Sequence, residues 1–312
     1  MDKILRVLKP DEILKLRLRS IYEEHGYRMY RMNCFEEYGF YLENKNFLLS
    51  DSVITFTDLD GRLLALKPDV TLSIVKHADG NDMKLYYTEN VYRPDRNKRS
   101  FKEIAQIGLE HIGRLDCENV CQVVALAAKS LKEVSENSIL EIGHCGFVGT
   151  LLKKYSPDMG FAKEMLALIS QKNVSDIKKL CDSTFLSEEA SNIFVSLPSL
   201  HGDAETVIDR ARKLCVNTET EASINELEAI CKEVNKQNGI CNIKLDLSLI
   251  GEEEYYNGVI FSGYVKGVPT RVLSGGRYDA LLEKLGKDCG AIGFALYFDE
   301  LEQFYSNIGG NC

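Results

Sequence analysis

The stretch LSGGRYDALLEKLGKDCGAIGFALYFDEL, residues 273–301, decides the fold and raises the question of function. It contains a glycine pair, a basic residue, a helix-forming run and a second cluster of small residues. Glycines let a backbone approach a ligand closely, so this order is typical of a binding site for a phosphorylated ligand. The second cluster, however, ends in Tyr297, Phe298, Asp299 and Glu300, whose bulk and negative charge would obstruct such a ligand.

Two β-patterned segments lie upstream, MKLYYTENVYR (83–93) and SFKEIAQIGLEHIG (100–113), joined by the charged connection PDRNKR. Because side chains alternate along a strand, Gln106, Gly108 and Glu110 share one face and apolar residues take the other. Two polar side chains that flank a glycine favour the floor of a pocket. A solvated sheet face is the alternative interpretation.

The N-terminal third also shows regular patterns. Apolar residues at helical spacing in DEILKLRLRSIYEEHGYRMYRM (11–32) predict a helix that leads into a strand. VITFTDLDGRLLALKPDVTLSIVKHA (53–78) predicts a hairpin that turns at Asp60-Gly61, followed by a helix that starts at Pro68.

Downstream, we predict a helix over residues 117–136 and a strand over 138–149. Helical periodicity then continues through residues 150–238. β-patterned segments return between 243 and 276, and the chain ends in a helix that starts at about Tyr278.

This order of strands, helices and strands predicts an α+β fold with an antiparallel sheet flanked by helices, rather than alternating βαβ units. Residues 1–149 and 239–312 would form the core of the fold. Residues 150–238 would form an inserted helical subdomain.

Composition limits the function classes. A hydrophobic content of 45% in 312 residues supports a sizeable core, and no long apolar window or signal peptide is present, so we expect a soluble, cytoplasmic protein. The net charge of −9 argues against binding of a polyanion. A local basic patch is still compatible with this charge.

The ten cysteines are scattered without a CxxC pair, so we interpret them as reduced and mostly buried thiols. Cys117 and Cys121 have a spacing that could hold a metal, but a helix without a nearby second pair favours core thiols. We therefore expect no metal site and no cofactor.

Other reactive side chains give weaker signals. His144 and Cys145 are adjacent and would point to opposite faces of a strand, which argues against a nucleophilic pair. His77 and His111 have no partner at metal-ligand spacing. A basic run could be a solvated hairpin tip, or could face a phosphorylated ligand or an acidic partner. It consists of Arg93, Arg96, Lys98, Arg99 and Lys102.

Four separated motifs together carry a family resemblance. They are ALKPDVT (65–71), VYRPDRNKRSFKEIAQIGLEHIG (91–113), EYYNGVIF (254–261) and the stretch quoted first (273–301). In this order they resemble the catalytic core of class II aminoacyl-tRNA synthetases, and specifically that of histidyl-tRNA synthetase, over nearly the whole chain.

The departures from that family bear on catalysis. In the synthetases the last motif carries a glycine that makes room for adenine and an arginine that meets the phosphates; here these positions hold Tyr297 and Glu300. The slot of a second arginine, which assists carboxylate activation, holds Gly251, and only Arg93 is retained. The resemblance therefore implies an amino-acid pocket without adenylation.

Synthetases of this type also carry a C-terminal anticodon-binding domain, and we expect none here because the sequence ends soon after Leu301. This combination resembles the regulatory subunits of ATP phosphoribosyltransferase, the paralogues that accompany the short-form catalytic subunit in the first step of histidine biosynthesis. The resemblance implies a non-catalytic homodimer within a hetero-oligomer, no tRNA partner, no membrane association, and histidine as a possible effector.

The same resemblance implies which residues hold histidine. An ammonium group is matched by carboxylate and hydroxyl acceptors, and an imidazole N–H is matched by a carboxylate. The implied ligand-binding residues are Asp69, Thr71, Arg93, Gln106, Glu110, Tyr255 and Tyr256.

Two alternatives stay open at this point. One is a truncated synthetase-like enzyme that activates an amino acid with ATP, and the other is an assembly scaffold without a ligand. The position of the histidine site, in this pocket or at the interface with the catalytic subunit, is also open.

Overall fold

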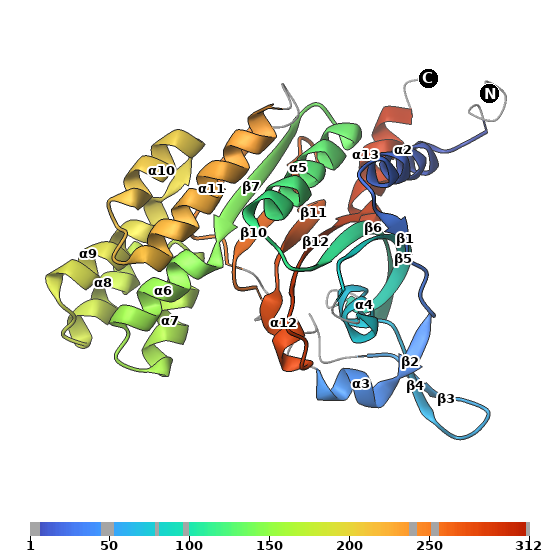
Figure 1. The fold of residues 1–312 in the computed structure, drawn as a ribbon, viewed down its shortest axis with the longest axis horizontal. Helices are drawn as coiled ribbons and strands as arrows, with labels where there is room; N and C mark the ends of the chain where they lie inside the picture. Colours follow the sequence, from blue (N-terminus) through green and yellow to red (C-terminus); the bar gives the residue numbers. More distant parts are fainter. Residues whose placement is uncertain are drawn as a thin grey trace.

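The computed structural model describes residues 7–44, 53–78, 81–95, 100–236, 242–250 and 256–309. Figure 1 shows a large sheet with helices on both faces and a group of helices at one end. The helices are α2 (Pro10–Glu24), α3 (Tyr38–Glu43), α4 (Thr71–His77), α5 (Cys117–Val134), α6 (Cys145–Tyr155), α7 (Met159–Ser170), α8 (Val174–Ser183), α9 (Glu188–Ser196), α10 (Ala204–Arg212), α11 (Thr218–Lys236), α12 (Asp279–Lys284) and α13 (Phe298–Gly309), with a 3-10 turn at Leu197–Ser199.

The strands form a nine-stranded and a three-stranded sheet, ordered β1-β5-β6-β12-β11-β10-β7-β9-β8 and β2-β4-β3. The six strands from β5 to β7 pair antiparallel, whereas β1 and β9 join them in parallel. The strands are β1 (Arg28–Met29), β2 (Phe35–Glu37), β3 (Thr55–Thr57), β4 (Leu63–Leu66), β5 (Met83–Asp95), β6 (Ser100–Gly113), β7 (Ser138–His144), β8 (His201–Gly202), β9 (Asn242–Asp246), β10 (Val259–Val265), β11 (Leu273–Arg277) and β12 (Gly290–Tyr297). The predicted α+β class with a largely antiparallel sheet is confirmed.

Several local predictions are confirmed by backbone conformation. Helix α2 ends just before Gly26, which adopts φ 84°, and the hairpin of β3 and β4 turns at Gly61 with φ 82°. Both values lie in the left-handed region, where glycine carries no steric penalty. The two long strands β5 and β6 also form where they were predicted.

Three predictions are wrong at element boundaries. The strand predicted over 138–149 ends at His144, because the Nδ1 atom of His144 accepts the backbone N–H of Phe147 and caps α6. The helix predicted at Pro68 begins at Thr71, after Asp69 accepts the N–H of Leu72. The terminal helix predicted from about Tyr278 is interrupted: α12 ends at Lys284, and strand β12, which was not predicted, precedes the final helix α13.

The two faces of the sheet have different roles. One face packs against α2 and α5 and forms the main core, which includes Ile107 and Leu109. The opposite face is covered by α4 and α12 and forms a smaller core with Tyr87 and Tyr278. Gln106 and Glu110 lie on this second face, so the predicted alternation along β6 is confirmed.

Helices α6 to α11 lie together beyond β7 (Figure 1). Their apolar side chains belong to the same core cluster as the main sheet. Polar contacts also join the two parts: Lys172 Nζ lies 2.7 Å from Asp246, and His144 Nε2 lies 3.0 Å from Glu226. The assignment of residues 150–238 as an inserted subdomain stays a prediction.

Within the described ranges, no helix is both long enough and apolar enough to cross a lipid bilayer.

Candidate functional site

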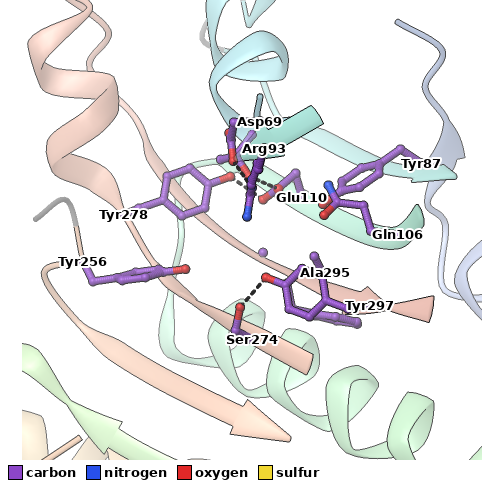
Figure 2. Close-up of a pocket in the computed structure, with 13 residues that line it drawn as sticks. Asp69, Tyr87, Arg93, Gln106, Glu110, Tyr256, Ser274, Tyr278, Ala295 and Tyr297 are labelled. Carbon is purple, nitrogen blue, oxygen red and sulfur yellow. Dashed lines mark hydrogen bonds and ion pairs between the residues drawn. The ribbon is translucent and has the colours of Figure 1, made fainter. Parts of the chain in front are cut away.

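A narrow polar pocket opens on the sheet face that α4 and α12 cover. Strands β5, β6, β11 and β12 form its floor and walls, and Figure 2 shows the side chains that converge on it. It is lined by Asp69, Thr71, Tyr87, Arg93, Gln106, Glu110, Tyr256, Ser274, Tyr278, Gly293, Phe294, Ala295 and Tyr297. Six of the seven predicted ligand-binding residues are thus in one place.

The seventh predicted residue, Tyr255, lies outside the described residues, as does Gly251 in the slot of the second arginine. Tyr256 is described and lies at the pocket wall in Figure 2. Its ring packs against Gly276, where a Cβ atom would come within 2.7 Å of the ring. The glycine pair of the quoted stretch therefore makes room for a pocket side chain.

Glu110 is the most buried charged-type side chain of the pocket, at 1% exposure. Thr71 Oγ1 donates a 2.7 Å hydrogen bond to Glu110 Oε1, and the Tyr278 hydroxyl donates to Oε2. Burial raises the pKa of Glu110 to about 8, against the opposing effect of these two hydrogen bonds, and the negative charge of Asp69 adds to the rise. The carboxyl group is therefore mostly protonated at pH 7, whereas the sequence suggested a carboxylate.

Gly293 allows Glu110 to occupy this position. The two residues are paired across β12 and β6, and a Cβ atom at position 293 would lie 1.7 Å from Glu110 Oε2. We expect Gly293→Ala to lower the free energy of unfolding by about 1–3 kcal/mol, as overpacking of a buried site does. Urea unfolding would measure this change.

Gly149→Ala is the matched control for that experiment. Position 149 lies in α6, and a methyl group added there would meet no atom within 4 Å, so alanine should stabilise the helix slightly. An unchanged unfolding midpoint for Gly293→Ala would show that the Glu110 carboxyl does not fill this space.

Asp69 and Arg93 form an ion pair at one end of the pocket (Figure 2). Arg93 Nη2 lies 3.2 Å from Asp69 Oδ2, and Arg93 Nε donates to the carbonyl of Pro68 at 2.7 Å. Each side chain is 16% exposed. An amino-acid zwitterion carries the complementary pair of charges, so it can bind between them with no net burial of charge.

Gln106 contributes an unsatisfied acceptor. Its side chain is 3% exposed, and its Oε1 atom has no hydrogen-bond partner. An unpaired buried polar group costs about 1–3 kcal/mol, so native structures rarely keep one without a reason. Because this oxygen lies in the pocket lining, it marks a place for a donor group of a ligand.

Tyr297 closes the pocket on the side of β11 (Figure 2). Its hydroxyl lies 2.7 Å from Ser274 Oγ, so the phenol ring spans from β12 to β11. Glu300, in contrast, is not in the pocket lining and accepts a hydrogen bond from Thr270. Of the two residues that depart from the synthetase motif, only Tyr297 therefore lies in the pocket.

The basic run is divided between two roles. Arg93 lies in the pocket, whereas Lys102 Nζ lies 3.2 Å from Asp299 and 3.9 Å from Glu300. Asp299 also accepts the backbone N–H of Ala105 at 2.9 Å. The acidic start of α13 therefore contacts the first part of β6, near the turn end of the β5–β6 hairpin. Residues 96–99 lie outside the described residues.

Sequence reasoning missed six residues of the pocket lining, namely Tyr87, Ser274, Tyr278, Gly293, Phe294 and Ala295. One signal was available for Tyr87, which pairs with Gly108 across β5 and β6. A Cβ atom at position 108 would lie 2.4 Å from the Tyr87 hydroxyl. A glycine between two polar residues of one strand face therefore indicated a large side chain opposite it.

The remaining candidates have structural partners. His144 accepts at Nδ1 and donates at Nε2 to Glu226, so it joins β7 to α11. His111 is buried and lies 2.8 Å from Asp82. The described cysteines form no disulfide, but only three of these eight are buried, so the expectation of mostly buried thiols is wrong; Cys117 itself is exposed.

Comparisons with known proteins agree with this geometry. The family model described as histidyl-tRNA synthetase matches residues 8–301. A crystal structure titled as an ATP phosphoribosyltransferase regulatory subunit/histidyl-tRNA synthetase from Bacillus halodurans is 27% identical, with a TM-score of 0.82 over 94% of this chain and 78% of that one. Fold and pocket together define a protein of the class II aminoacyl-tRNA synthetase fold, of the histidyl type.

Comparison with curated relatives identifies the family within this class. The ATP phosphoribosyltransferase regulatory subunit of Caldanaerobacter subterraneus is 31% identical over 90% of this chain and 74% of its own length. That of Oceanobacillus iheyensis is 28% identical over 94% of this chain and 73% of its own length. The chain belongs to the family of ATP phosphoribosyltransferase regulatory subunits.

Proposed function

We propose that this chain is a non-catalytic subunit that binds free histidine in the pocket and thereby controls a short-form ATP phosphoribosyltransferase catalytic subunit. The observation that supports histidine as the ligand is the unpaired side-chain oxygen of buried Gln106, which lines the same pocket as the Asp69–Arg93 ion pair. Together these groups offer acceptors for an ammonium group and a donor for a carboxylate. In this proposal histidine acts as the feedback inhibitor of the assembled enzyme.

Glu110 is suited to the imidazole ring. Its carboxyl group is mostly protonated at pH 7 because burial raises its pKa to about 8, and free imidazole is mostly neutral at that pH. The two groups can therefore share one proton in a hydrogen bond without bringing a net charge into the pocket. A charged carboxylate is not required for recognition.

The absence of catalysis is supported by the closed side of the pocket. The Tyr297 ring, held by Ser274, lies where the resemblance to the synthetases places adenosine. In the sequence, Gly251 occupies the position of one of the two arginines that the resemblance assigns to carboxylate activation. Electrostatic stabilisation of developing charge is usually the largest catalytic contribution, so its loss should abolish adenylate formation.

The alternative is an enzyme that makes an aminoacyl-adenylate. The polar pocket with its retained Arg93 favours this alternative, because that arginine is the one shared with the synthetases. Histidine-dependent exchange of pyrophosphate into ATP separates the two functions. Exchange above background by the purified chain would establish the enzyme and overturn the regulatory proposal.

Reconstitution tests the regulatory function directly. The chain would be mixed with a short-form catalytic subunit, and formation of phosphoribosyl-ATP would be measured with and without histidine. We expect activity to need both proteins and to fall as histidine is added. Full activity of the catalytic subunit alone would contradict the proposal, and a histidine-insensitive complex would remove the feedback part of it.

Gln106→Leu tests the ligand assignment. Leucine keeps the volume and removes the acceptor, so histidine affinity should fall by about 1–3 kcal/mol, or roughly 5- to 150-fold. Calorimetry on the assembled complex would measure it.

Thr88→Val is the matched control for the glutamine variant. Thr88 Oγ1 is also buried without a hydrogen-bond partner, but Thr88 does not line the pocket. Its replacement should leave histidine affinity unchanged. Equal affinities for wild type and Gln106→Leu would place the histidine site elsewhere, for example at the interface with the catalytic subunit.

The assembly and location follow from the same proposal. We expect a homodimer of this chain within a cytoplasmic hetero-oligomer, because the class II fold resemblance implies a dimeric core. Light scattering of the chain alone would check the dimer, and scattering of the reconstituted mixture would give its stoichiometry.

A further inference from the structure

Two thiols lie side by side at the start of α5, outside the lining of the histidine pocket. Cys117 is the first residue of the helix and Cys121 lies one turn later, with 4.0 Å between the two Sγ atoms. Cys117 is exposed and Cys121 is buried. The pair is thus open to solvent through Cys117, which the expectation of core thiols did not include.

The sulfur separation distinguishes two uses of such a pair. A disulfide needs about 2.05 Å between the sulfur atoms, so the sulfurs would have to approach each other by about 2 Å. Two metal–sulfur bonds of about 2.3 Å span 4.0 Å when the angle at the metal is about 120°. Bridging by one metal atom therefore requires almost no movement, and the angle fits three-coordinate geometry.

The surroundings supply room for a third ligand, and no described His, Asp or Glu side chain joins the two thiols in a metal-binding group. The thiols lie in a groove of about 510 Å³ between the start of α5 and the end of α11. Among the described residues, no three His, Cys, Asp or Glu side chains come together as a metal site. The groove is lined by Cys117, Glu118, Cys121, Gln122, Ala229, Lys232, Glu233 and Lys236.

Coordination preference then selects the ion. Zn²⁺ takes four ligands in structural sites, and only two are present here. Soft thiolate ligands select Cu(I), zinc and iron–sulfur clusters, and iron–sulfur clusters need four cysteines, so Cu(I) is the ion that fits two thiols. We propose that Cys117 and Cys121 form a binding site for one soft monovalent cation of the copper(I) class, with the third ligand supplied from solution.

Cation binding releases protons but involves no redox step. Each thiol loses one proton as its sulfur binds the cation, and no electron is transferred, because the copper is already Cu(I). Affinity should therefore increase with pH over the neutral range.

The test uses Cu(I) under anaerobic conditions, in competition with a Cu(I) chelator of known affinity. Wild type should take up one more tightly bound Cu(I) per chain than Cys117→Ser or Cys121→Ser, and each variant should lose about 10-fold or more in affinity at this site. Cys34→Ser is the matched control, since Cys34 is also exposed. It should retain the wild-type stoichiometry.

A second readout does not depend on the folding of the variants. Bound Cu(I) should protect Cys117 of the wild-type chain from alkylation, as followed by peptide mass spectrometry, and should leave Cys34 reactive. Unchanged Cu(I) uptake by both serine variants, or equal alkylation of Cys117 with and without Cu(I), would overturn the proposal. Zn²⁺ binding at the pair as tight as that of Cu(I) would overturn the choice of ion.

Discussion

Replacing Glu110 with glutamine should remove a large pH-dependent loss of stability between about pH 5 and pH 8. The folded pKa of Glu110, about 8, lies above the ordinary glutamate value of 4.5. Below about pH 4.5 the group is protonated in both states and its contribution to stability is complete. As the pH rises towards 8, the unfolded state releases a proton that the folded state keeps, so the free energy of unfolding falls by up to about 1.4 kcal/mol per pH unit.

Chemical denaturation at closely spaced pH values would measure this effect as the difference between wild type and Glu110→Gln. The wild-type pH profile alone would not isolate Glu110, because other carboxyl groups change the free energy of unfolding in the opposite direction. Burial tends to raise the pKa of Glu226, for example, but the interaction with His144 outweighs it and lowers that pKa. Glu103→Gln is the matched control, an exposed carboxylate on the same strand. Parallel pH profiles for wild type and Glu110→Gln would contradict the burial of a protonated carboxyl group.

The same variant links stability to ligand binding. Glutamine cannot share a proton with an imidazole, so histidine affinity should also fall in Glu110→Gln. The two effects have one origin, because the burial that raises the pKa of Glu110 also prepares it for a neutral ring. A stable but histidine-insensitive variant is therefore the expected phenotype below pH 8.

The sequence was sufficient to predict which residues form the pocket floor, but not which residues form the pocket walls. Alternation along β6 placed Gln106 and Glu110 on one face, because a strand has a period of two and a buried face fixes its register. Neither the unpaired state of Gln106 Oε1 nor the raised pKa of Glu110 could be predicted. Both depend on burial by α4, α12 and β12, which is a property of the tertiary fold.

Strand β12 shows why part of the fold was missed. Its sequence, GAIGFALY, is rich in small residues, and glycine is depleted in strands in general. In the structure these small residues are required by close neighbours, since Gly293 faces the Glu110 carboxyl group. A strand selected for close packing against a polar side chain resembles a loop when only its local sequence is considered.

Glu300 illustrates a different limit. The sequence identified a carboxylate where the related synthetases carry an arginine, and predicted repulsion of phosphates. The structure adds that Thr270 and Lys102 lie beside Glu300, outside the pocket lining. The carboxylate of Glu300, which replaces the positive charge of an arginine, thus has structural partners in this chain. The effect of Glu300 on a nucleotide would be electrostatic rather than steric.

The double change Tyr297→Gly with Glu300→Arg should give the chain measurable affinity for ATP, which the wild type should lack. Removing the phenol ring frees the space between β11 and β12, and the new guanidinium supplies a cation for the phosphates. By the strength of a partly exposed charge pair, the gain should be about 3 kcal/mol, or roughly 100-fold. Calorimetry with magnesium and ATP would measure it.

Tyr297→Phe is the control that separates volume from hydrogen bonding. It loses the bond to Ser274 but keeps the ring, so it should bind ATP no better than wild type. The double variant should still fail in pyrophosphate exchange, because Gly251 leaves the reacting carboxylate with Arg93 alone. Tight ATP binding by the wild-type chain would refute the argument, since it would mean that the tyrosine leaves the nucleotide site open.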